Sequence, residues 1–173
     1  SYNTFRTSIQ PRQLMEVSVS AGNLIHTLQI ERGATAGFLQ SKGQKFADVL
    51  PDMRGNTSER LAAFAREADR IDSAQMALLS AAVGKARGEL QQLETIRQRA
   101  SDLSLTVPEE VAYYTGAIAA LIDAMSVGVE LNRDAAISQQ MIAYLSFVRA
   151  KENAGQERAL VTAAFAANQR GVL

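Results

Sequence analysis

The 173-residue sequence contains no cysteine, which excludes disulfide bonds, thiolate chemistry and zinc sites built on cysteine. His26 is its one histidine, so no second imidazole is available to share a metal ion. The signatures of common enzyme classes are missing too: there is no glycine-rich phosphate loop, no Ser/His/Asp ordering and no HExxH segment. We therefore expect no metal site, no cofactor and no enzyme.

An excess of charge of either sign is also absent. The 18 lysines and arginines are balanced by 18 aspartates and glutamates, so no basic surface field favours nucleic acid. No apolar run approaches the length of a membrane span, and we expect any transmembrane helices to flank the sequence. An anionic ligand would therefore depend on local cations.

What is present is helical periodicity, in a chain that is 47% hydrophobic and long enough for one domain, residues 1–173. Only three prolines interrupt it. The pattern predicts an all-α antiparallel bundle of four long helices and one shorter helix, joined by short loops. The expected helices cover about 11–40, 57–71, 73–103 and 108–131, followed by a last helix after Asp134 that runs toward Gly171.

The clearest helix start in the sequence is Thr106–Glu110. Thr106 is a cap candidate, Pro108 suits the first turn, and Glu109 and Glu110 follow at the positive end of the helix dipole. The macrodipole is sufficient to explain this acidic pair without a catalytic role.

Three arginines occupy positions on apolar helix stripes where a leucine would be expected: Arg32, Arg97 and Arg158. A guanidinium cannot lose its proton to escape burial, so each needs anionic or carbonyl partners. The spacing allows two interpretations. The arginines form internal ion pairs with nearby acids such as Glu31 and Glu94, or they line a pocket for an anion.

Weaker candidates accompany these arginines. Gly33 and Gly155 could allow close approach of helix backbones, and both could equally be ordinary packing residues. Tyr114 faces the core stripe and could extend its hydroxyl into a pocket, although most such tyrosines simply pack. Lys151 lies on the same helix as Arg158, and His26 points away from the apolar stripe of its own helix.

Four segments of the sequence resemble, in the same order, the nitrate- and nitrite-sensing (NIT) domain of bacterial receptors. Together they cover most of the chain. They are IERGATAGFL (30–39), LQQLETIRQRASD (90–102), EEVAYYTGAIAALIDAM (109–125) and YLSFVRAKENAGQERALVTAAFA (144–166).

In that family a nitrate ion is held between helices by arginines from separate segments. The resemblance implies that Arg32, Arg97 and Arg158 are the ligand-binding residues of this chain. Nitrate suits such a site, because a guanidinium fork donates two parallel N–H bonds to a planar anion. The second shell expected around them comprises Gly33, Tyr114, Lys151 and Gly155.

The resemblance also implies a biological setting: the sensor domain of a signalling receptor, such as a chemoreceptor or sensor kinase. We expect it to be periplasmic and homodimeric, with a helix-packing change that passes to an output domain outside this chain. The alternatives are a cytoplasmic regulator, a sensor of the same fold for another small anion or an amino acid, and a structural dimerisation bundle. NIT domains usually continue with further helices, so we expect truncation at the C-terminal end or a shorter variant.

Overall fold

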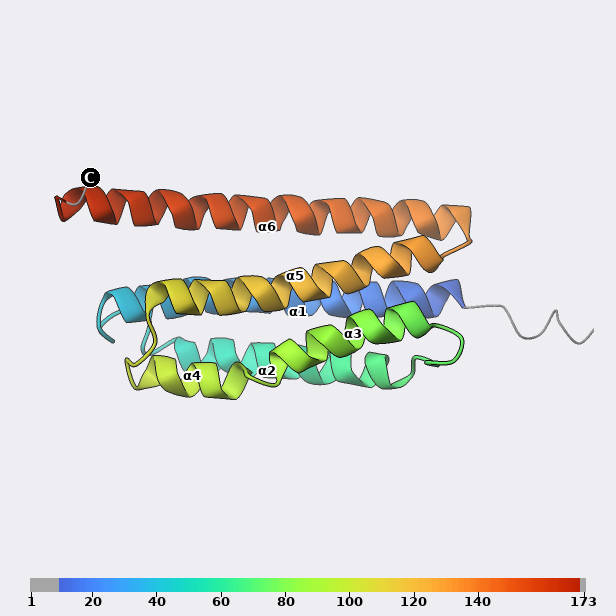
Figure 1. Cartoon of the computed structure of the whole chain (residues 1–173), viewed down its shortest axis with the longest axis horizontal. Helices are drawn as coiled ribbons and strands as arrows, with labels where there is room; N and C mark the ends of the chain where they lie inside the picture. Colours follow the sequence, from blue (N-terminus) through green and yellow to red (C-terminus); the bar gives the residue numbers. More distant parts are fainter. Residues whose placement is uncertain (1–9, 172–173) are drawn as a thin grey trace, which may run out of the picture.

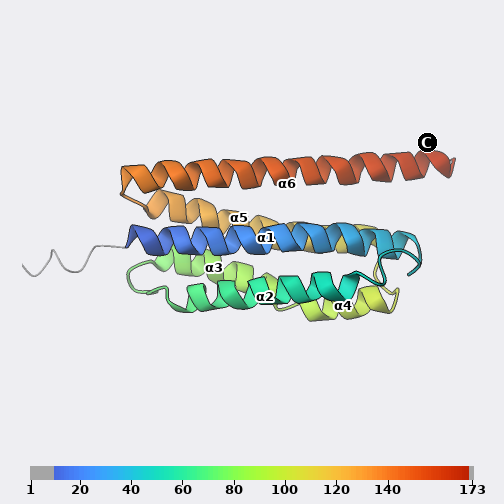
Figure 2. The same ribbon diagram turned by 180° about the vertical axis from the view of Figure 1, so that it is seen from behind.

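A computed structural model describes residues 10–171, and in this part of the chain the regular structure is helical throughout (Figure 1). The prediction of an all-α antiparallel bundle is confirmed. Figures 1 and 2 show three tiers: α6 on one side, α1 and α5 in the middle, and α2, α3 and α4 on the other. The helices are α1 (Pro11–Gln40), α2 (Leu50–Asp69), α3 (Ala77–Leu90), α4 (Leu93–Ser101), α5 (Val107–Leu131) and α6 (Ala135–Gln169).

The central tier holds most of the apolar core. Helix α1 begins at Pro11, where the missing N–H of proline costs no helical hydrogen bond, and it packs against α2 and α5. Helix α5 packs against α1 and α3. The side chains with no exposed surface at these contacts include Leu24, Leu28, Ile118 and Leu121.

Helix α2 begins earlier than the sequence indicates. The predicted start near Thr57 or Ser58 is wrong, because the helix starts at Leu50 with Pro51 in its first turn. Thr57 lies in the helix interior, where its buried hydroxyl donates to the carbonyl of Met53. A hydroxyl bonded in this way needs no role as a cap.

The third predicted helix, about 73–103, is divided in the structure into α3 and α4 by a turn at Gln91 and Gln92. The residues on either side, Leu90 and Leu93, are both buried, at 4% and 2% exposed. The apolar spacing therefore continues across the break, which explains why the sequence pattern predicts one helix there.

The predicted start of α5 is confirmed as a capping box. The Thr106 hydroxyl accepts from the Glu109 N–H, and the Glu109 carboxylate accepts from the Thr106 N–H. These bonds, first among them the backbone bond from Thr106, lower the pKa of Glu109. Glu110 differs from its neighbour because it points inward and has no exposed surface.

Helix α5 is long and apolar enough to cross a membrane by length and composition, so the expectation that no run approaches this length is wrong. Within the bundle it carries ten buried residues and packs against α1 and α3. This is the setting of a central core helix.

Helix α6 is the outermost and longest element, with 35 residues and a length of about 50 Å. Its buried residues are only Met141, Leu145, Val148 and Glu152. The part that follows Glu152 is largely exposed and includes Leu160, Val161 and Phe165. Helix α6 is therefore attached to the bundle mainly through its first half.

Candidate functional site

A group of buried polar side chains lies inside the bundle between α1, α4, α5 and α6. We call it the polar cluster, and each member is at most 6% exposed. Helix α1 contributes two adjacent residues and α5 contributes two residues one turn apart. The members of the polar cluster therefore lie at one level along the bundle. Its members are Glu31, Arg32, Arg97, Glu110, Tyr114 and Glu152.

Arg32 forms a bidentate ion pair across the α1–α6 interface. Its Nη1 donates to Oε2 of Glu152 at 2.8 Å, and its Nη2 donates to Oε1 of Glu152 at 2.9 Å. The same Nη1 also donates to the Thr115 hydroxyl of α5 at 3.1 Å. Two parallel bonds between a guanidinium and a carboxylate are the strongest form of this interaction, so Arg32 connects α1, α5 and α6.

The Glu152 carboxylate collects two further donors. The side-chain amides of Gln29 and Gln156 both donate to it at 3.1 Å. Burial alone would raise the pKa of Glu152, but the hydrogen bonds from Arg32, Gln156 and Gln29 outweigh burial and lower the pKa. Four N–H groups thus surround one planar, two-oxygen anion.

Gly155 leaves space for the Arg32 guanidinium on the surface of α6. A Cβ atom at this position would lie 2.9 Å from Nη2 of Arg32. Any larger residue would push the guanidinium away from α6, so the glycine permits the ion pair with Glu152.

Arg97 forms the second bidentate pair of the polar cluster. Its Nε and Nη2 donate to the Glu31 carboxylate at 2.9 and 2.8 Å, and the Tyr114 hydroxyl donates to the same carboxylate. Its Nη1 donates to Glu94 at 2.6 Å and to the Ser58 hydroxyl at 3.1 Å. Burial acts to lower the pKa of Arg97, but the bonds and charges of Glu31 and Glu94 outweigh it and raise the pKa.

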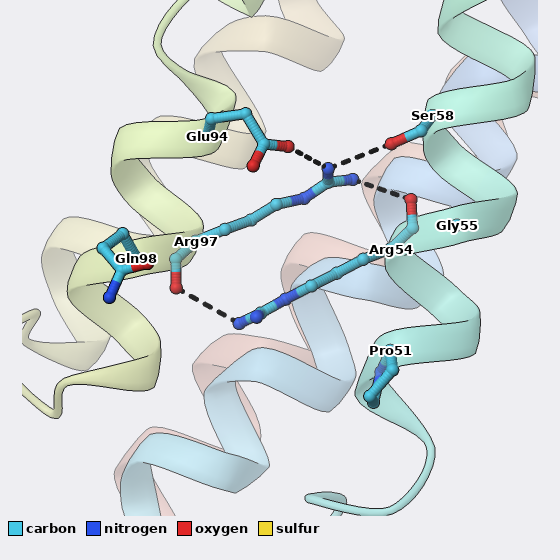
Figure 3. A pocket seen from close by; sticks show the side chains of 7 residues that line it. All are labelled: Pro51, Arg54, Gly55, Ser58, Glu94, Arg97 and Gln98. Carbon is cyan, nitrogen blue, oxygen red and sulfur yellow. Dashed lines mark hydrogen bonds and ion pairs between the residues drawn. The ribbon is translucent and has the colours of Figure 1, made fainter.

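A pocket of about 360 Å³ lies between α2 and α4, beside Arg97 (Figure 3). In this view Arg54 and Arg97 lie next to each other and point in opposite directions. Each donates to the backbone carbonyl of the other: Arg97 Nη2 at 3.0 Å and Arg54 Nη2 at 3.3 Å. This reciprocal bonding joins α2 to α4, while the buried Nε of Arg54 is left without a hydrogen-bond partner among the described residues.

Glu110 is the unusual member of the polar cluster, because neither of its buried carboxylate oxygens has a hydrogen-bond partner among residues 10–171. Burial raises its pKa to about 9, with the charge of Glu31 adding to the effect and that of Arg32 opposing it. Glu110 is therefore neutral near pH 7. Arg32 and Arg97 are then balanced by Glu152 and Glu31, which is the internal ion-pair arrangement.

The structure does not bring the three predicted arginines together. Arg158 is exposed on the second half of α6, so the expectation that it points into the bundle is not met. Lys151 is half-buried and its Nζ contacts Nδ1 of His26 instead of an acid of the polar cluster. Gly33 is exposed with open space around it. Tyr114 does reach the polar cluster with its hydroxyl.

Sequence reasoning missed Glu152, the main partner of Arg32. The signal was present, since Leu145, Val148 and Glu152 follow the three- and four-residue steps of a buried helix face. Gln29 and Gln156 give no such signal, because their positions on the helices are only partly buried or exposed.

A second pocket, of about 270 Å³, opens between α5 and α6 next to Glu152. We call it the α5–α6 groove. Beside the carboxylate it presents an arginine, an aspartate and two amide side chains. Its lining consists of Ala119, Ile122, Asp123, Arg149, Glu152, Asn153 and Gln156.

Comparison with known proteins identifies relatives of this chain in sequence and in fold. The nitrate regulatory protein of Klebsiella oxytoca is 31% identical over 163 residues, which cover 92% of this chain and 41% of that protein. The solved structure of the NasR transcription antiterminator matches with a TM-score of 0.83 at 29% identity, covering 87% of this chain and 41% of that one. This chain thus spans about two fifths of the length of these relatives. A family model described as nitrate and nitrite sensing matches residues 23–171, and the chain belongs to this family.

Proposed function

We propose that this chain binds nitrate or nitrite inside the helical bundle and is the sensing part of a regulatory protein. Family membership supports the ligand class. The observation that carries the proposal is the set of four N–H donors from Arg32, Gln29 and Gln156 that surrounds the Glu152 carboxylate. A carboxylate and a nitrate are both planar anions with coplanar oxygens, so donors placed for one suit the other.

Arg32 is the anchor of the proposed site. Its fork offers two parallel N–H bonds, and its position at the α1–α6 contact means that an anion there touches two helices. Arg97, held by the neighbouring Glu31, is proposed as the second ligand residue. Arg158 is proposed as a third ligand residue, contributed from the exposed half of α6, and this role remains a prediction.

The proposed setting is a cytoplasmic regulator. The periplasmic chemoreceptor that we expected from the sequence has no support among the relatives, which are named a nitrate regulatory protein and a transcription antiterminator. Both names describe regulators, which also agrees with a role in sensing and not in catalysis. The output activity would belong to the part of the protein outside this chain.

The proposal is tested by thermal unfolding and calorimetric titration with nitrate, nitrite and chloride at equal ionic strength. Nitrate at roughly a hundred times its dissociation constant should stabilise the protein by about 2.7 kcal/mol. Arg32→Lys keeps the charge but loses the fork, and should bind nitrate at least about tenfold more weakly. Arg66→Lys, the same exchange at an exposed position of α2, is the matched control and should bind like the parent. Equal shifts with chloride and nitrate would refute a nitrate-specific site.

A second candidate function is a purely structural bundle, because Arg32 and Arg97 are both neutralised by internal carboxylates. Under this interpretation Arg32→Ala strands the buried Glu152 charge and costs about 3–5 kcal/mol of stability. No nitrate-specific stabilisation of the parent would then be observed. The two candidates are separated by the nitrate shift, since both predict some loss of stability on truncation of Arg32.

A further inference from the structure

We propose that Glu152 is an internal ligand of the anion site, and that nitrate displaces its carboxylate from Arg32 into the α5–α6 groove, where Arg149 accepts it. This inference rests on the proposed function and adds how binding is regulated and how α6 reports it. In the protein without nitrate, the Glu152 carboxylate occupies Arg32. Nitrate has to compete with this carboxylate, and the competition sets both the affinity and the specificity of nitrate binding.

The first step is that the fork of Arg32, its parallel N–H groups on Nη1 and Nη2, is occupied while Glu152 is in place. Both of its Nη atoms bond to Glu152, and Nη1 also bonds to Thr115. The side of the guanidinium that faces α6 is closed by the backbone at Gly155, where even a Cβ would lie 2.9 Å from Nη2. With Arg32 only 6% exposed, an anion reaches the fork by replacing Glu152.

The second step is that the displaced carboxylate has a destination. Glu152 borders the α5–α6 groove, and Arg149 lines the same groove one turn earlier on α6. Arg149 is exposed and belongs to none of the ion pairs in the described part of the chain. A move from Arg32 to Arg149 exchanges one cation for another, so no charge is left buried without a partner.

The third step concerns α6 itself. Glu152 is the last buried residue of this helix, and its carboxylate joins α6 to α1 through both Arg32 and Gln29. Its release removes these charge-assisted bonds from the α1–α6 interface. The exposed second half of α6 follows directly after Glu152. A change in how α6 packs on α1 therefore passes along the helix and is the signal of nitrate binding.

The test is a calorimetric nitrate titration of the full chain, four single variants and one double variant, each checked for folding by circular dichroism. Glu152→Gln removes the competing charge and should raise nitrate affinity about tenfold or more. Glu152→Asp keeps the charge but withdraws the oxygens from Arg32, and should raise affinity less. Arg149→Gln should weaken nitrate binding in the parent and have no effect when combined with Glu152→Gln. Glu157→Gln, an exposed acid on the same helix, is the control.

The outcomes separate the inference from the proposed function. Nitrate binding that is equal in the parent and Glu152→Gln would overturn the displacement and leave nitrate sensing intact. Weaker binding by Glu152→Gln would also overturn it, because Glu152 would then support the ligand. If Arg149→Gln still weakens nitrate binding when it is combined with Glu152→Gln, the proposal that Arg149 accepts the displaced Glu152 carboxylate is refuted. No nitrate binding by the parent or by either Glu152 variant would refute the proposed function, and the inference with it.

Discussion

Replacement of Glu110 by glutamine should abolish a specific part of the pH dependence of folding. In the part of the chain that the structure describes, Glu110 has no exposed surface and no hydrogen-bond partner, and burial raises its pKa to about 9. The unfolded chain ionises this group near its ordinary value of about 4.3. Between about pH 5 and pH 8 the folded protein therefore holds one proton more at Glu110 than the unfolded chain does.

The sign of the effect follows from this difference. Stability falls with rising pH wherever the folded state binds more protons, by about 1.4 kcal/mol per pH unit for one proton. Over three units Glu110 should cost the parent about 4 kcal/mol, a cost that levels off above about pH 9. Glu110→Gln cannot ionise, so its stability relative to the parent should rise by this amount from pH 5 to pH 8.

Urea denaturation at pH 5, 6, 7 and 8 measures the free energies of unfolding. The difference between the two proteins is the quantity of interest, because Glu152, with its lowered pKa, and other groups contribute to both curves. Glu130→Gln, an exposed change on the same helix, should follow the parent at every pH. A difference between Glu110→Gln and the parent that stays constant with pH would show that Glu110 is ionised in the folded protein.

Three further changes test other parts of the polar cluster and the proposed site. Tyr114→Phe removes the hydroxyl that donates to Glu31 and should lower the free energy of unfolding by about 2 kcal/mol in urea titrations; an unchanged value would contradict that bond. Gly155→Ala should displace the guanidinium of Arg32 and therefore weaken nitrate binding in calorimetry. In thermal unfolding, the higher helix propensity of alanine, about 1 kcal/mol, should offset the strain. Unaltered nitrate affinity would show that the guanidinium moves aside without cost. Arg158→Lys should weaken nitrate binding without changing the melting temperature of the empty protein, because the side chain is exposed, and equal affinity would remove Arg158 from the site.

The helical class and the best-defined helix ends follow from the amino-acid sequence alone. Spacing of apolar residues at three and four positions has one simple solution, a helix with one buried face, and the capping box at Thr106 and Glu109 depends only on neighbours in the chain. The position of Arg32 and Arg97 on buried faces follows from the same spacing. The break between α3 and α4 at Gln91 cannot be predicted from the sequence, because the apolar spacing continues through it.

The contacts of those arginines depend on the tertiary structure. Arg32 pairs with Glu152 across 120 positions of the chain, and Arg97 pairs with Glu31 across 66, and no local pattern encodes such pairings. The exposure of Arg158 is tertiary too, since its stripe is continuous with Val148 but the bundle beneath α6 covers little beyond Glu152. Helical periodicity fixes which face of a helix a residue occupies, whereas burial and partners depend on where the neighbouring helices lie.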